Sequence, residues 1–310
     1  MNYKKLGLIL GAGTVLGTSS AFANLVINPT FDSSITSSGS SAQIQATINQ
    51  AIAFYNANYT DPITVEITFK VANTGLGSSS TGFIFDTYSN FRTQLGADAS
   101  TPDDATALSF LATGAVNPVT GGANVAISRA NAKALGYSIG AGVDGTITLN
   151  NTICNLVHGT NTNASFYDFY AVTCHEIDEV LGTISLAGDP FGSGRTNGAD
   201  LFRYNGAGVR TWDTASTHAA FFSIDGGTTN IVEYNALGRT GGDWGDWIHH
   251  NGAPQVQDFS GTPGVTVDMG PSEIRLLDVV GYNRVVVPEP ASIVVLGLGA
   301  VALLRRRKKA

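Results

Sequence analysis

Apolar segments lie near both ends of the chain, so the globular part must be formed by the residues between them. The first segment begins with Lys4 and Lys5, continues through an uncharged, largely apolar run from Leu6 to Gly17, and closes with Ala21-Phe22-Ala23. This order is typical of a secretory signal peptide with its cleavage site. An N-terminal membrane anchor is the alternative, but the apolar run is too short to span a bilayer comfortably. We therefore expect export and cleavage after Ala23.

The C-terminal segment combines three features in a fixed order. Pro288-Glu289-Pro290 comes first, an apolar run from Ala291 to Leu304 follows, and the basic run 305–309 comes last. A helix over the apolar run would be about 21 Å long at 1.5 Å per residue, short of a hydrocarbon core of roughly 30 Å. The basic run would stay on the cytoplasmic side. A transient anchor suits this segment better than the alternative, an ordinary permanent tail anchor.

These three features together resemble the PEP-CTERM sorting signal of Gram-negative bacteria. The resemblance implies processing by an exosortase-type enzyme, transient attachment to the inner membrane, and delivery to the cell surface or the extracellular matrix. With 1–23 as the signal peptide and 288–310 as the sorting tail, residues 24–287 form the body. A body of this length is compatible with one large domain.

The body is strongly acidic. The whole chain has 17 Lys+Arg and 24 Asp+Glu, and seven of the basic residues but one of the acidic residues lie in the two end segments. The body therefore has 10 basic against 23 acidic residues, a net charge of −13. Binding to nucleic acid or to anionic lipid requires clustered Lys and Arg. We therefore exclude nucleic acid as a partner of the body.

Two cysteines, Cys154 and Cys174, lie in the body. In an oxidising compartment such a pair can form a disulfide, and the alternative is two buried free thiols. Cys174 adjoins His175, but neighbouring residues on a helix point to different faces, so a cysteine nucleophile is disfavoured.

Hydrophobic periodicity predicts an α+β body. The predicted strands cover 24–35, 63–69, 145–149 and 220–224. The predicted helices cover 43–55, 88–95, 103–111, 128–135, 166–181 and 272–280. The Gly- and Ser-rich stretch 75–82 is predicted to be a loop.

The helix predicted over 166–181 carries the sequence His175-Glu176-Ile177-Asp178-Glu179. His175 and Glu179 are four residues apart and so share one helix face, which is how a helix offers two ligands to one metal ion. Glu176 lies at the edge of that face, within reach of a metal-bound water, and is the candidate general base. Gly182 lets the chain turn away and bring back a third ligand. Three protein ligands and one water make the open site that hydrolysis requires.

This helix resembles that of the zincin metalloproteases, whose motif is His-Glu-x-x-His. His175, Glu176 and Gly182 match, whereas Glu179 replaces the second histidine and Ser185 stands where the extended motif has a third. The body as a whole also resembles a group of exported proteins classed as metalloproteases that carry PEP-CTERM tails. The resemblance implies a zincin-like fold with a mixed twisted sheet, an active-site helix and a smaller loop-rich C-terminal part. A carboxylate ligand donates more charge than imidazole, so we expect a less acidic bound water or a different metal.

Spacing does not fix the third ligand. Asp200 is the first choice, because it follows a Gly-rich excursion and precedes an apolar run. The remaining candidates are histidines, in the order His250 or His249, His218 and His158. Met269 precedes the last helix and would either floor the site, as the Met-turn does in metzincins, or fill the core.

Two loops rich in Asp and Gly, 225–227 and 243–247, suggest calcium as a second possible metal. Neither has the spacing of a calcium loop, and Asp-Gly pairs are usually turns. Trp244 and Trp247 would either form a sugar-binding platform or lie buried.

From these features we expect an exported zinc-dependent peptidase acting on peptide or protein substrates. Zinc would be held by His175, Glu179 and Asp200, with Glu176 as the general base, in a cleft between the two parts of the body. The strand over 145–149 is expected at the sheet edge, where a substrate could add as a further strand. The alternatives are an inactive matrix or surface binding protein on the same fold, and a surface structural protein with carbohydrate affinity.

Overall fold

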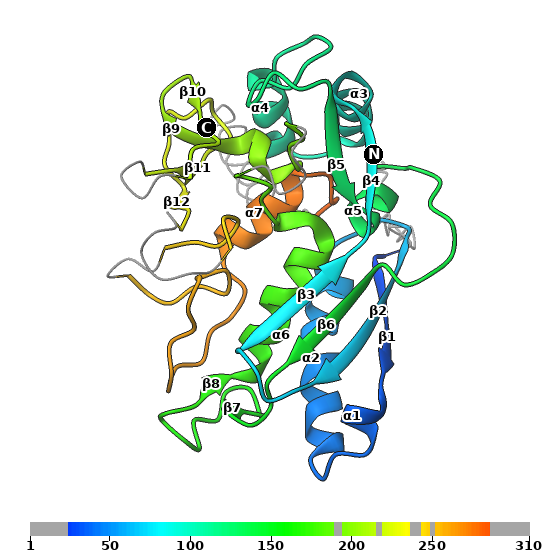
Figure 1. Ribbon diagram of the computed structural model, residues 1–310, viewed down its shortest axis with the longest axis vertical. Helices are drawn as coiled ribbons and strands as arrows, with labels where there is room; N and C mark the ends of the chain where they lie inside the picture. The colour runs from blue at the N-terminus through cyan, green and yellow to red at the C-terminus, as the bar shows by residue number, and fades with distance from the viewer. Residues whose placement is uncertain (1–23, 189–193, 215–218, 236–242, 249–251, 286–310) are drawn as a thin grey trace, which may run out of the picture.

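The computed structural model describes residues 24–188, 194–214, 219–235, 243–248 and 252–285. The expected signal peptide and sorting tail lie outside these ranges. The described chain is mixed α/β, with helices packed around several small sheets (Figure 1). The largest sheet has the strand order β1-β2-β6-β3. Its strands are β1 (Val26–Phe31), β2 (Thr64–Val71), β6 (Gly145–Leu149) and β3 (Gly77–Thr81).

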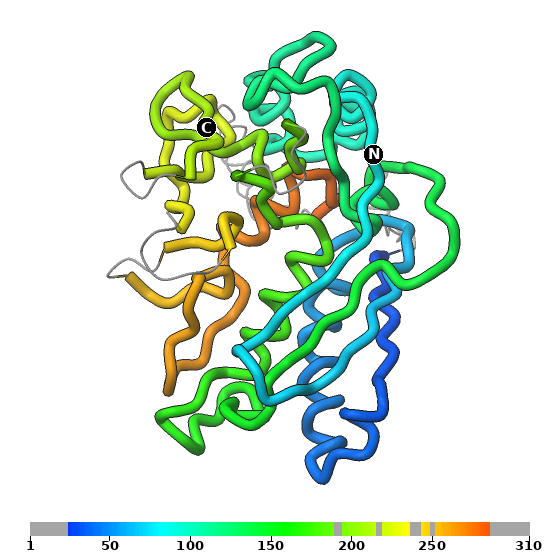
Figure 2. Tube along the Cα trace, viewed as in Figure 1, coloured from blue at the N-terminus to red at the C-terminus, as the bar shows by residue number. Residues whose placement is uncertain are grey.

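The strands β1, β2 and β6 are parallel, and β3 joins β6 in antiparallel register at one edge. Two helices, α2 (Ser41–Asn58) and α6 (Phe169–Asp178), pack against each other, and α6 also contacts β3 and β6. Figure 2 shows α6 running between this sheet and the C-terminal loops. The fully buried core between these layers includes Ile48, Val65, Phe69, Ile147 and Ile177.

Of the remaining described helices, all but the last along the chain begin after a residue whose side chain caps a free amide. In α4 (Pro102–Phe110) the Thr101 hydroxyl accepts from the amide of Asp104, whose carboxylate accepts from the amide of Thr101, which is a capping box. The others are α1 (Ser33–Thr36), α3 (Tyr88–Asp98), α5 (Arg129–Ala134) and α7 (Pro271–Val279).

Three smaller sheets complete the described fold. The first has the order β10-β9-β11-β12 and belongs to the C-terminal half, and the other two are the pairs β4-β5 and β7-β8. Their strands are β4 (Phe83–Thr87), β5 (Asn124–Ser128), β7 (Cys154–Asn155), β8 (Tyr167–Asp168), β9 (Arg203–Gly206), β10 (Val209–Arg210), β11 (Phe221–Phe222) and β12 (Val232–Glu233).

Two sequence predictions about the main sheet are wrong. The stretch 75–82 is not a loop, because it contains β3, whose Ser-rich sequence has little intrinsic strand preference but pairs with all of β6. The strand β6 is therefore an interior strand, and β3 is the edge. The position of β6 is also fixed by packing, since a Cβ at Gly145 would lie 2.5 Å from the Val180 side chain.

Both cysteines are free and buried. Burial raises the pKa of Cys154 to about 12 and that of Cys174 well above its ordinary value. The structure therefore has two buried thiols in place of the disulfide that the sequence left open. Among the described residues, no helix has the length and apolar character needed to cross a bilayer.

Candidate metal centre

The helix α6 presents the motif residues to a pocket. Its first turn is capped by Asp168, whose carboxylate accepts from the amide of Tyr170. At Glu179 the helix continues into one π-helical turn, η1 (Glu179–Thr183). Within this turn Gly182 has a φ of 119°, a left-handed conformation that a side chain would strain, and it kinks the chain there. The predicted helix thus exists, but it is shorter than 166–181 because β8 precedes it and the π-helical turn follows.

Three potential ligands converge at this point: His175, Glu179 and Asp246, with ligand atoms within 4.8 Å of one another. His175 Nε2 lies 3.8 Å from Glu179 Oε1 and 3.4 Å from Asp246 Oδ1. Ligands about 2.1 Å from a tetrahedral ion are roughly 3.4 Å apart, so the spacing fits one small divalent cation. Asp246 Oδ1 is buried and makes no well-formed hydrogen bond to the described residues.

The ring of His175 is held by the C-terminal loop 254–259. His175 Nδ1 lies 2.9 Å from the Val256 carbonyl oxygen, to which it can only donate. This contact leaves Nε2 directed at the carboxylates, and a carbonyl on the second nitrogen is a common partner of metal-binding histidines. The loop itself is held by α7, because the amides of Val256 and Gln257 donate to Glu273 Oε1 at 2.9 and 3.4 Å.

Glu179 and Asp246 also have supporting contacts. The Ser79 hydroxyl, on the edge strand β3, donates to Glu179 Oε2 at 2.7 Å. Arg203 is buried and donates to the carbonyl of Trp244 at 2.7 Å, which fixes the loop that carries Asp246. Each ligand is therefore positioned by a different element of the fold.

Glu176 lies beside the three ligands, with Oε2 buried and without a hydrogen-bond partner among the described residues. Burial raises the pKa of Glu176 to about 9, and Glu179 adds to this effect, while His175 opposes it. Burial would lower the pKa of His175, but the carboxylates led by Asp246 outweigh it and hold that pKa well above its usual value. A cation at this site would compete with protons for the lone pairs of these carboxylates and of the imidazole.

The pocket over these residues has a volume of about 320 Å³. Its lining includes the acidic residues Glu176, Glu179, Asp243 and Asp246, with Asp168 and Asp258 as further carboxylates, and several apolar side chains. The apolar residues include Leu76, Tyr167, Val172, Val265 and Val267. The pocket lies between β3, α6 and the C-terminal loops, and His175 and Glu179 line it as expected for the predicted cleft.

The structure does not bring Asp200 to this site. Its carboxylate is buried and accepts from the Ser185 hydroxyl and from the amides of Leu186 and Asn197, the latter two at 2.9 Å each. Asp200 therefore closes the turn after η1, and Asp246 takes the third position in the group.

The other candidates from the sequence have separate surroundings. His158 lies between Asp168 and Asp268, at 2.8 and 3.0 Å, while His218, His249 and His250 lie outside the described residues. The sulfur of Met269 accepts from the Tyr55 hydroxyl at 3.6 Å, beside α6. Trp247 is fully buried and cannot stack on a sugar.

The proposed calcium loops also differ from expectation. Asp225 accepts from Ser223 and Thr229, so it stabilises its own turn. In the loop 243–247, Asp243 and Asp246 line the pocket of α6. The Asp-rich sequence of this loop suggested calcium, but no local spacing connects Asp246 with His175, so this partner could not be predicted from the sequence.

Residues 286–308 match the PEP-CTERM protein-sorting motif. The chain is an exported protein marked for exosortase. The motif also indicates sorting to the cell surface. No curated protein and no solved structure matches the chain.

Proposed function

We propose that the body is a metal-dependent hydrolase of peptide bonds, delivered to the cell surface, with a zincin-like fold. The observation that carries this proposal is the convergence of His175, Glu179 and Asp246 beside Glu176 in one pocket. The edge strand β3 contacts α6, so the sheet offers a free edge beside this group.

The donor set suits a small divalent ion, and zinc is the first candidate. One imidazole and two carboxylates would give a neutral complex with a divalent cation, and the buried Asp246 Oδ1 would gain a partner. When bound, such an ion supplies Lewis acidity to a substrate carbonyl and to a water molecule. Calcium fits less well, because it takes six or more oxygen ligands.

Glu176 would hold the proton taken from the attacking water and return it to the leaving amine. The substrate would lie along β3, where an extended peptide can pair with the exposed edge of the sheet. An apolar side chain of the substrate would occupy the wall formed by Leu76, Val172 and Val265.

A catalytically inactive matrix or surface binding protein is the second candidate, and the raised pKa of Glu176 favours it. At a pKa of about 9 the carboxyl is protonated at neutral pH and cannot accept a proton. A nearby cation would lower this pKa, so Glu176 can act as a base only when the metal is bound.

The test is metal content by elemental analysis of residues 24–287, purified without chelators. We expect about one zinc per chain in the wild type. Asp246→Asn should lose it, whereas Asp200→Asn should keep it in whatever fraction stays folded. A metal-free wild type, or zinc lost only with Asp200→Asn, would contradict the proposed site.

The second test is hydrolysis of an unfolded protein substrate by the zinc-loaded body. Glu176→Gln should lose at least about 100-fold in rate, the usual range for a general base, and retain its zinc. Equal activity in the two proteins would remove Glu176 from the mechanism. Zinc binding without any hydrolysis would leave the binding-protein candidate.

A further inference from the structure

The last described residues are bonded to the body up to the start of the sorting motif. The amide of Asn283 donates to both carboxylate oxygens of Asp61, at 3.2 and 3.0 Å, and its side chain donates to Asp98 at 2.9 Å. The carbonyl of Asn283 accepts from the amide of Thr60 at 2.7 Å. The amide of Val285 donates to the carbonyl of Asn58 at 2.7 Å, and the motif match begins at the next residue.

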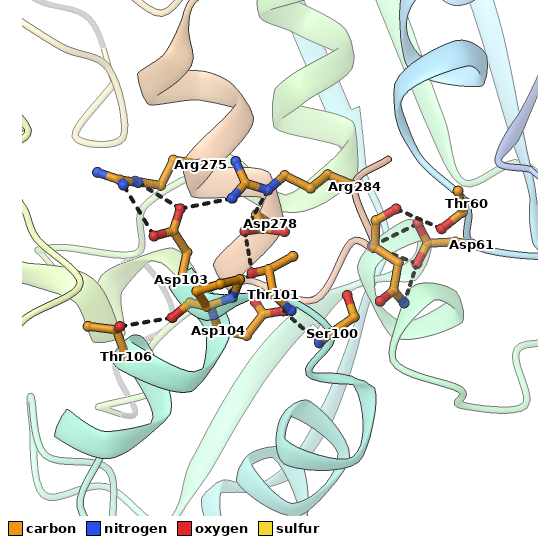
Figure 3. Close-up of polar contacts among 12 residues, drawn as sticks. Thr60, Asp61, Ser100, Thr101, Asp103, Asp104, Thr106, Arg275, Asp278 and Arg284 are labelled. Carbon is orange, nitrogen blue, oxygen red and sulfur yellow. Dashed lines mark hydrogen bonds and ion pairs between the residues drawn. The ribbon is translucent and has the colours of Figure 1, made fainter. Parts of the chain in front are cut away.

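Charged groups fix the same segment from the other side (Figure 3). Arg284 pairs with Asp103 at 3.2 Å and with Asp278 at 3.3 Å. Arg275, on α7, also pairs with Asp103, at 2.9 Å, and the Thr101 hydroxyl donates to Asp278 at 2.8 Å. The segment 283–285 is therefore joined to the end of α2, to the turn between α3 and α4, and to α7.

This attachment leaves little chain between the body and the sorting motif. Pro288 is three residues beyond Val285, so even a fully extended chain would place it no more than about 10 Å away. An enzyme that binds Pro288-Glu289-Pro290 must therefore approach the folded body closely, unless the segment 283–285 detaches first.

The surface around this exit is suited to such an approach. We define the exit face as Pro62, Ala97, Ala99, Ser100, Pro102 and Val285, all of them exposed. Their side chains are small or rigid and carry no charge, although the body as a whole has a net charge of −13. The charged side chains next to them are paired: Asp61 and Asp98 bond to Asn283, and Asp103 pairs with the partly exposed Arg275 and Arg284. Docking of the exit face would thus desolvate few unpaired polar groups and order few flexible side chains.

We propose that the exit face is a docking surface for exosortase, which binds the folded body and the sorting motif as one unit. The attached segment 283–285 sets the distance between the two binding elements. Joining them in this way makes the second contact intramolecular and raises its effective concentration.

The first test inserts eight Gly and Ser residues between Val285 and Val286 of the full chain, co-expressed with an exosortase. The body is unchanged, and the inserted chain has an average span of about 16 Å. We measure tail removal by mass spectrometry of the intact protein. The rate should fall about tenfold, because the longer connection lowers the effective concentration of the second binding element. An unchanged or faster rate would overturn the proposal, since the motif would then be read alone or after release of 283–285.

The second test places charge on the exit face. The double variant Ala97→Glu and Ala99→Glu should slow tail removal, whereas Ala42→Glu should not. Ala42 is also exposed but lies at the opposite end of α2, about 24 Å from Asn58. Equal rates for the wild type and both variants would overturn the proposal. A melting temperature identifies any variant that fails to fold. For such a variant, the insertion experiment tests the proposal instead.

A third measurement separates the enzyme from the lipid surface. Purified full chain and exosortase are mixed in detergent micelles, and the rates are measured again. A defect of the double variant that persists in detergent supports contact with the enzyme. A defect that disappears there places the contact on the bilayer and overturns the assignment to exosortase.

Discussion

At Gly77, the edge strand β3 passes so close to Glu176 that no side chain fits between them. A Cβ at this position would lie 2.3 Å from Glu176 Oε1 and 2.9 Å from Val172 Cγ1. The backbone of Gly77 is not in the left-handed region, so the requirement for glycine comes from space alone.

We therefore predict that Gly77→Ala displaces the Glu176 carboxylate while leaving the three ligands in place. Zinc content should be unchanged, and the hydrolysis rate should fall about 100-fold, as expected for a catalytic group displaced by about 1 Å. The matched control is Gly39→Ala, because a Cβ there meets nothing within 4 Å. A fully active Gly77→Ala protein would contradict the placement of Glu176.

At this scale, the sequence predicted two of the three side chains that converge in the pocket. His175 and Glu179 follow from helical spacing alone. Asp246 does not, because its position depends on how a distant loop is tied down by Arg203 and by the second sheet. Asp200 had a suitable sequence context, yet its carboxylate satisfies the amides of its own turn.

Among the elements, α7 supports the site indirectly, through a loop that contacts His175. Glu273 is fully buried and holds the amides of Val256 and Gln257, and the carbonyl of Val256 in turn orients His175. Gln257 adds a second connection, because its side chain donates to the His175 carbonyl at 3.1 Å.

We predict that Glu273→Ala weakens zinc binding about tenfold or more, the usual effect of removing support behind a ligand. Glu273→Gln should restore most of the affinity, since its amide oxygen can accept the same bonds. Competition with a chromophoric chelator measures both. Equal affinities in all three proteins would show that α7 does not position His175.

The elements themselves were predictable where local signals are strong. The helices α3, α4, α5 and α7 were found because caps, prolines and glycines delimit them. The strand β3 was missed because it consists of Gly, Ser and Thr and forms only through its pairing with β6. The error about the sheet edge followed from this omission, since strand order depends on tertiary contacts.

For the whole molecule, buried carboxyls determine how stability varies with pH. Burial raises the pKa of Asp61 to about 6 and those of Asp98 and Asp278 to about 7. The ordinary value is 3.8, so between about pH 4 and pH 7 the folded state holds protons that the unfolded state releases. The stabilisation that these bound protons give the folded state is complete below this pH range and is lost as the pH rises through it.

We therefore predict that the melting temperature of metal-free 24–287 falls as the pH rises from about 4 to about 7.5. Asp98→Asn should flatten this dependence, because the amide does not titrate. Calorimetry at several pH values measures the slope. A melting temperature that rises over the same interval would contradict the assigned shifts.

The two buried cysteines have a practical consequence for an exported protein. Only a thiolate reacts with alkylating reagents, and burial keeps both thiols neutral and covered. Labelling of Cys174 therefore requires α6 to open, and its rate reports the free energy of that opening. A ligand that binds only the closed form slows the reaction in proportion to its occupancy. Since Cys174 directly precedes His175, its labelling rate, followed by mass spectrometry, would report binding of the proposed metal without the need for a substrate.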